Sequence, residues 1–130
     1  IPMTNDQQNP KIINSGKKYD LVDRTTKFSK QIIALCNNLP KNSISNPLIG
    51  QLIRSGTSIG ANYSEADEAS SKKDFLNKIF IAKKESKETR YWLDLICYSF
   101  PNFEIETLNL KQEAKELNLI LSSIINKSKS

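Results

Sequence analysis

The sequence predicts an all-α fold, specifically an antiparallel up-and-down four-helix bundle. Three observations support this prediction. Apolar residues recur at steps of three and four along four separate stretches, as they do on one face of an α-helix. The 130 residues include only four glycines and five prolines, fewer than the many turns of an all-β fold require. The stretches between the four patterns are short, which is typical of antiparallel neighbours in a bundle.

The first predicted helix covers residues 20–38. One of its faces carries, at steps of four, three, four, three and four, the residues Leu21, Thr25, Phe28, Ile32, Leu35 and Leu39. Pro40 ends the helix, because proline disfavours helical geometry in the residue before it.

The second predicted helix begins at Asn46, a good N-cap followed by a proline in the first turn, and ends near Ala69. Its expected inner face contains Leu48, Leu52, Ser55, Ile59 and either Tyr63 or Asn62. Gly56 and Gly60 lie one turn apart, and small residues at this spacing favour close approach of a neighbouring helix.

The third predicted helix runs from a cap at Ser70 or Ser71 to about Ser99, before Pro101. Its expected inner face consists of Phe75, Ile79, Ala82, Ser86, Thr89, Leu93 and Ile96.

The fourth predicted helix begins after Asn102, which we expect to cap it, and frays from Lys127 onward. Leu110, Ala114, Leu117, Leu121 and Ile124 mark its inner face.

Two domain segments follow from these patterns. Residues 19–127 form the bundle domain, and residues 1–18 form a disordered basic arm, rich in Asn and Gln and without a sustained period. Ile1 and Pro2 precede Met3 and are typical of a vector-derived addition.

The composition argues against an enzyme and against a bound cofactor. The chain has no histidine, which removes the commonest general base and the commonest metal ligand together. Cys36 and Cys97 lie within apolar patterns and are expected to be reduced thiols of the core, which indicates the cytoplasm. No apolar run approaches the length of a membrane span, so we expect a soluble protein.

The third helix is the candidate binding surface. Residues 72–90 contain seven basic and three acidic residues, in a chain of net charge +5. We predict phosphate contacts, without readout of bases, from Lys72, Lys73, Lys83, Lys84, Lys87 and Arg90. Arg24, Lys27 and Lys30 on the first helix add to this interpretation. The alternative is a solvated face with local ion pairs such as Lys84–Glu88.

Five polar residues near the apolar side of the central helices form a candidate buried network that fixes helix register: Arg54, Asn62, Glu65, Glu85 and Glu88. A carboxylate-based enzyme that uses Glu65, Glu85 and Glu88 is the weaker alternative. A di-iron bundle would use Glu-x-x-His motifs, and the chain has no histidine.

Aromatic residues gather at the end of the third helix, namely Tyr91, Trp92, Tyr98 and Phe100. They are compatible with a platform on which bases stack. The sequence favours instead a place in the core or in a subunit contact.

Two motifs carry a family resemblance. Leu52–Glu65 reads Leu-x-Arg-Ser-x-x-Ser-Ile-x-Ala-Asn-x-x-Glu, and Phe75–Glu88 reads Phe-x-x-x-x-x-Ile-Ala-x-x-Glu-x-x-Glu. This resembles the four-helix-bundle proteins encoded in 23S rRNA intervening sequences. The sequence departs at Gly60, where relatives often have proline.

The resemblance implies an antiparallel bundle that assembles as a homo-pentamer and has no enzymatic activity. A related branch, the accessory variability determinants of diversity-generating retroelements, implies binding of nucleic acid through a basic surface and partnership with a reverse transcriptase. We therefore expect a non-enzymatic, oligomeric protein that binds RNA or DNA and takes no small-molecule substrate. The alternative is a protein–protein adaptor that does not bind nucleic acid directly.

Overall fold

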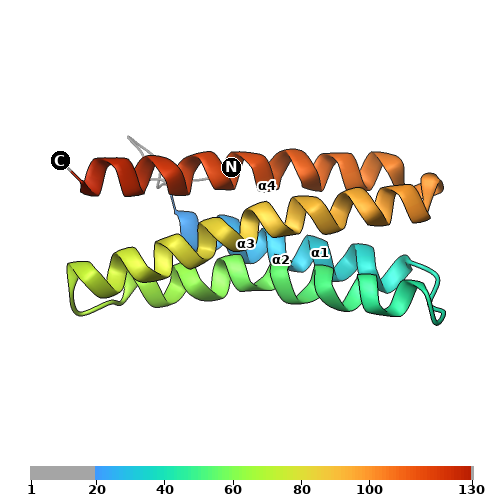
Figure 1. The fold of residues 1–130 in the computed structure, drawn as a ribbon, viewed down its shortest axis with the longest axis horizontal. Coiled ribbons are helices and arrows are strands. Elements are labelled where there is room, and N and C mark those ends of the chain that lie inside the picture. Colours follow the sequence, from blue (N-terminus) through green and yellow to red (C-terminus); the bar gives the residue numbers. More distant parts are fainter. Residues whose placement is uncertain (1–19, 130) are drawn as a thin grey trace, which may run out of the picture.

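The computed structural model describes residues 20–129. They form four α-helices, α1 (Leu21–Asn38), α2 (Ser45–Asp67), α3 (Lys72–Ser99) and α4 (Glu104–Ser128), with a short 3-10 turn, η1 (Pro101–Phe103), before α4. The helices lie lengthwise beside one another, with α3 between α2 and α4 in the view of Figure 1. This part of the chain contains no strand, and the predicted four-helix bundle is confirmed. The predicted arm, residues 1–18, lies outside the described residues.

The core fills the space between the four helices. Its largest fully buried apolar side chains come from every helix: Phe28, Ile32, Leu52, Ile59, Ile79, Leu93, Ile96, Leu117 and Leu121. All nine occupy inner positions that the sequence patterns predicted. Apolar periodicity therefore identified the centre of the bundle correctly.

The inner face of α2 differs from the prediction at both of its ends. Ile49 is buried and Leu48 is only partly buried, while Gly60 is buried and Tyr63 is only partly so. The prediction followed large apolar residues, but the closest packing on α2 uses residues with almost no side chain.

Gly56 and Gly60 allow α1 to approach α2 closely. A Cβ atom at Gly56 would lie 3.0 Å from Cγ1 of Ile32, and one at Gly60 would lie 3.2 Å from Oγ1 of Thr25. The predicted purpose of these small residues, close helix approach, therefore holds for the contact between α1 and α2.

The start of α1 follows the prediction, and its last turn uses a lysine that the sequence analysis did not consider. Asp20 caps the start, since its carboxylate accepts a hydrogen bond of 3.2 Å from the backbone N–H of Asp23. At the other end, Nζ of Lys41 donates to the carbonyl oxygens of Cys36, Asn37 and Leu39 at 2.5, 3.0 and 2.8 Å. These bonds satisfy acceptors that a helix end leaves without partners.

Two predicted caps are wrong. Asn46 lies inside α2, and Asn42 acts instead, because its side-chain oxygen accepts 2.9 Å hydrogen bonds from the N–H groups of Ile44 and Ser45. Asn102 lies inside η1, and α4 begins at Glu104 with no hydrogen bond from a capping side chain. In both cases a turn of a few residues places the start of the helix at a different residue from the one that the predicted cap implied. The second helix also ends at Asp67, slightly before the predicted Ala69.

Both cysteines are free thiols. Cys36 is buried, and burial raises its pKa to about 11, whereas Cys97 is partly buried. Among residues 20–129, no helix is long and apolar enough to cross a membrane.

Candidate nucleic-acid interface

The charged side chains of α3 divide between its neighbours and the solvent. The helix begins at Ser71, whose hydroxyl oxygen accepts a 3.0 Å hydrogen bond from the N–H of Asp74. Asp74 lies in the first turn, where the helix dipole favours a negative charge. The other acidic side chains of α3, Glu85, Glu88 and Asp94, pair with basic residues of neighbouring helices. The acidic residues of α3 therefore neutralise charges of α2 and α4.

Arg54 of α2 holds two of these carboxylates. Its guanidinium donates from Nη1 to Glu85 at 3.1 Å and from Nη2 to Glu88. Glu88 also accepts a 2.9 Å hydrogen bond from Nε1 of Trp92. The side chain of Glu85 is only 10% exposed, so this pair is largely shielded from water. The cluster ties α2 and α3 together at a fixed register.

The predicted polar network is thus brought together only in part. Arg54, Glu85 and Glu88 meet, and Trp92 joins them although sequence reasoning had not included it. Asn62 donates instead to the carbonyl of Ser58 at 2.8 Å, within its own helix. Glu65 pairs with Nζ of Lys78 at 2.8 Å, and this pairing raises the pKa of Lys78. The spacing of Glu88 and Trp92, four residues apart on one helix, was the clue to the missed member.

The local ion pair Lys84–Glu88 is absent from the structure, and its prediction is wrong. Glu88 turns toward Arg54, which offers a guanidinium with several donors, and Lys84 is left exposed.

The six predicted phosphate contacts share one property. Within residues 20–129, none of them has a salt-bridge partner, whereas the remaining lysine of this stretch, Lys78, is paired. The six fall into a pair at the start of α3 and a group near its middle, listed in order as Lys72, Lys73, Lys83, Lys84, Lys87 and Arg90. The two groups are about 15 Å apart along the helix axis.

The group near the middle of α3 has an exposed part and a part close to α4. Lys84 and Lys87 are exposed. Lys83 is partly buried, and Asn118 of α4 donates to its backbone carbonyl at 3.2 Å. Arg90 is also partly buried, and its Nε is shielded from solvent without a hydrogen-bond partner in the described part of the chain. The basic surface therefore spans the outer side of α3 and its border with α4.

The aromatic residues at the end of α3 separate into two kinds. Trp92 and Phe100 pack partly against the core, as expected. Tyr91 and Tyr98 are 56% and 86% exposed. Of the two predicted places for them, the core is therefore wrong, and a subunit contact stays a prediction. The ring of Tyr91 meets Trp92 edge-on, with centroids 5.2 Å apart. Phe80 is also exposed on this helix.

Arg24 does not contribute to the basic surface as predicted. It joins α1 to α4, since it donates from Nε and Nη2 to Glu113 at 2.7 Å and from Nη2 to Glu116 at 2.9 Å. Hydrogen bonds from Gln112 and Arg24 lower the pKa of Glu116. Lys27 and Lys30, the other two residues of that prediction, are exposed.

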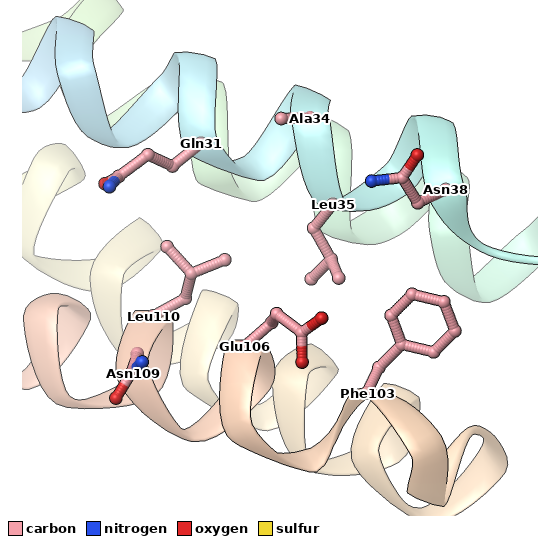
Figure 2. A pocket seen from close by; sticks show the side chains of 8 residues that line it. All are labelled: Gln31, Ala34, Leu35, Asn38, Phe103, Glu106, Asn109 and Leu110. Atoms are coloured by element: carbon pink, nitrogen blue, oxygen red, sulfur yellow. The ribbon is translucent and has the colours of Figure 1, made fainter.

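A groove lies between α1 and α4, which contact each other far less than the other neighbouring helices do. It has a volume of about 290 Å³, and its lining residues are Gln31, Ala34, Leu35, Asn38, Phe103, Glu106, Asn109 and Leu110. Figure 2 shows Glu106 and Phe103 directed from the α4 side toward Leu35 and Asn38. Its lining contains one carboxylate and no second titratable group, so it lacks a pair for acid–base chemistry. In residues 20–129 no three potential metal-ligating side chains are grouped.

Comparisons with known proteins agree with this fold. The family model described as 23S rRNA-intervening sequence protein matches residues 17–123. A crystal structure from Bacteroides thetaiotaomicron, described as a protein of unknown function from the S23 ribosomal protein family, is 37% identical. It superposes with a TM-score of 0.74 over 82% of this chain and 98% of that one. No curated protein matches the sequence.

Proposed function

We propose that this chain, which belongs to the 23S rRNA-intervening sequence protein family, is a non-enzymatic, oligomeric protein that binds RNA or DNA through basic side chains of α3. One observation carries the proposal. The acidic residues of α3 beyond its first turn are paired with neighbouring helices, while the six basic residues named above have no salt-bridge partner in residues 20–129. Positive charge therefore accumulates on one side of the helix, where it attracts phosphates.

The position of Lys72 and Lys73 supports the same function. They lie in the first turn of α3, at the positive end of the helix dipole, which disfavours cations. An unfavourable placement with no compensating ion pair is typical of residues retained for binding. A phosphate group near this turn would contact both lysines and the positive end of the dipole.

Titration of a fluorescently labelled structured RNA with the purified chain, at about 50 and 200 mM salt, tests the proposal. We expect the affinity to fall steeply with salt, since each phosphate contact releases counterions. The triple substitution Lys83→Gln, Lys84→Gln and Lys87→Gln is expected to weaken binding strongly at low salt. Lys78→Gln is the matched control, because Lys78 lies on the same helix but is paired with Glu65.

Absent binding, or binding indifferent to salt, would contradict a role in neutralising phosphates. Such a result would favour the adaptor alternative, in which the basic face binds an acidic protein partner.

The proposal includes assembly as a homo-pentamer, which the family resemblance implies. Exposed apolar side chains on several helices, including Ile33, Ile53, Leu108 and Leu119, support a contact between copies. Sedimentation velocity and native mass measurement test this part. A monomer at micromolar concentration would contradict it and would leave the binding proposal standing.

A reverse transcriptase as partner and a cytoplasmic location complete the proposal. What supports the partner is the basic surface shared with the retroelement branch of the resemblance. The gene's neighbourhood and co-purification with a neighbouring reverse transcriptase test it. A gene inside a ribosomal RNA operon, with no reverse transcriptase nearby, would contradict the retroelement role.

A further inference from the structure

We propose that the outer face of α3 is a stacking surface for the bases of single-stranded nucleic acid, with Tyr91 as its central ring. This inference rests on the proposed function and adds the class of nucleic acid bound. The surface, called the basic–aromatic ridge below, consists of Lys73, Phe80, Lys84, Lys87, Tyr91 and Tyr98.

The six residues of the ridge lie along one line of the helix. Their spacings of seven, four, three, four and seven return to nearly the same angle about an α-helix each time. All six are exposed. The ridge is about 38 Å long, given the rise of about 1.5 Å per residue. An extended strand has room on it for several nucleotides.

The lysines of the ridge are available to phosphates. Within residues 20–129, Lys73, Lys84 and Lys87 have no salt-bridge partner. Glu85 and Glu88, the acidic residues next to Lys84 and Lys87, face Arg54 of α2. Rings and positive charges therefore share one surface, which is the combination that single-strand binding grooves use.

The ring of Tyr91 is held in place by the protein. Trp92 contacts it edge-on at 5.2 Å, and Nε1 of Trp92 donates to Glu88 at 2.9 Å. Glu88 is fixed in turn by Arg54. A ring supported in this way loses little conformational freedom when a base stacks on its exposed face. The polar network between α2 and α3 thus supports the binding surface.

The presence of charges and rings on one surface favours a single strand over two other ligands. In a duplex the faces of the bases are stacked on each other, so the exposed rings of the ridge would have no partner. A contact with a second protein surface would have few lysines at its centre, since interfaces are depleted of them. Exposed lysines between aromatic rings match phosphates between bases.

The test compares a labelled single-stranded oligonucleotide of about 15 nucleotides with its duplex, at one low salt concentration, by fluorescence anisotropy. We expect Tyr91→Leu to weaken single-strand binding about tenfold and to leave duplex binding unchanged. Tyr91→Phe, which keeps the ring, is expected to bind like the parent chain. Ile105→Ala, at an exposed apolar residue of α4 outside the ridge, is the matched control.

A second readout uses Trp92, the one tryptophan of the sequence, which touches Tyr91. A stacked base should change its fluorescence in the parent chain and much less so in Tyr91→Leu.

Three results would overturn the inference. Salt-dependent binding that Tyr91→Leu leaves unchanged for both ligands would remove the stacking surface and leave phosphate binding by α3 intact. A loss of self-association in Tyr91→Leu without weaker single-strand binding would assign the ridge to a contact between copies. No binding of any nucleic acid by the parent chain would remove both this inference and the proposed function.

Discussion

Two sides of α3 both carry charged residues, and only one side neutralises them within the bundle. On the side toward α2, Glu85 and Glu88 are neutralised by Arg54, and Lys78 is neutralised by Glu65. On the outer side, Lys84 and Lys87 have no salt-bridge partner in the described part of the chain. The difference shows that ion pairs between helices, and not within α3, decide where positive charge remains. The first side holds the bundle in register, and the second is available to a ligand.

Removal of Arg54 tests the first side and has the largest expected effect on stability. Arg54→Met leaves Glu85 largely buried without its partner, which should lower the free energy of unfolding by about 2 kcal/mol. Lys84→Met, on the outer side of α3, should change the free energy of unfolding by less than about 0.5 kcal/mol. Urea unfolding followed by circular dichroism measures both. Equal effects would show that the two sides of α3 do not differ in this way.

A similar contrast between a packed and an open position exists on α2. An added Cβ at Gly60 would meet Thr25 at 3.2 Å, whereas one at Gly50 would meet nothing within 4 Å. We expect Gly60→Ala to destabilise the chain by about 1 to 2 kcal/mol, because it pushes α1 and α2 apart. Gly50→Ala should stabilise it by up to about 1 kcal/mol, because alanine favours the helix. Thermal unfolding of the two variants checks the opposite signs, and the same sign for both would contradict the close approach.

The contact of Arg24 with Glu116, between α1 and α4, has the smallest expected effect on the free energy of unfolding, and this effect depends on pH. Hydrogen bonds from Gln112 and Arg24 lower the pKa of Glu116 in the folded state. The folded state therefore gains from ionised Glu116 above the usual carboxyl range, and this gain is lost as pH falls through the lowered pKa. Unfolding midpoints of the parent chain should drop more between about pH 6 and 3 than those of Arg24→Met. Parallel curves would mean that Arg24 does not act on Glu116.

Much of the fold could be predicted because it depends on long, regular periods. The inner positions of α1, α3 and α4 follow the three-and-four spacing, and burial of Phe28, Ile79 and Leu117 confirms it. The exceptions lie toward the helix ends, where the predicted inner residues Phe75 and Ile124 are only partly buried. The caps at Asn46 and Asn102 could not be predicted in the same way, since a turn of a few residues decided each start. The choice between the core and a subunit contact for Tyr91 could not be made from the sequence either, because its distance from the core depends on where the neighbouring helices lie.

The sequence was enough to name the candidate residues of the site, but it could not explain why these residues have no salt-bridge partner within residues 20–129. The sequence indicated six basic residues on α3, but it also offered Lys84–Glu88 as a local pair. Only the position of Arg54 on the neighbouring helix explains why Glu88 turns away. A single sequence contains the charges, and the packing of α2 on α3 decides which of them are neutralised.

The most direct test of the central claim is the salt dependence of RNA binding, measured one lysine at a time. Each phosphate contact contributes about 0.7 to 0.9 to the slope of log affinity against log salt concentration. We predict that Lys87→Gln lowers the magnitude of this slope by about that amount, and that Lys78→Gln leaves it unchanged. Equal slopes for Lys87→Gln and the parent chain, or a lower slope for Lys78→Gln alone, would contradict the claim that the outer lysines of α3 contact phosphates.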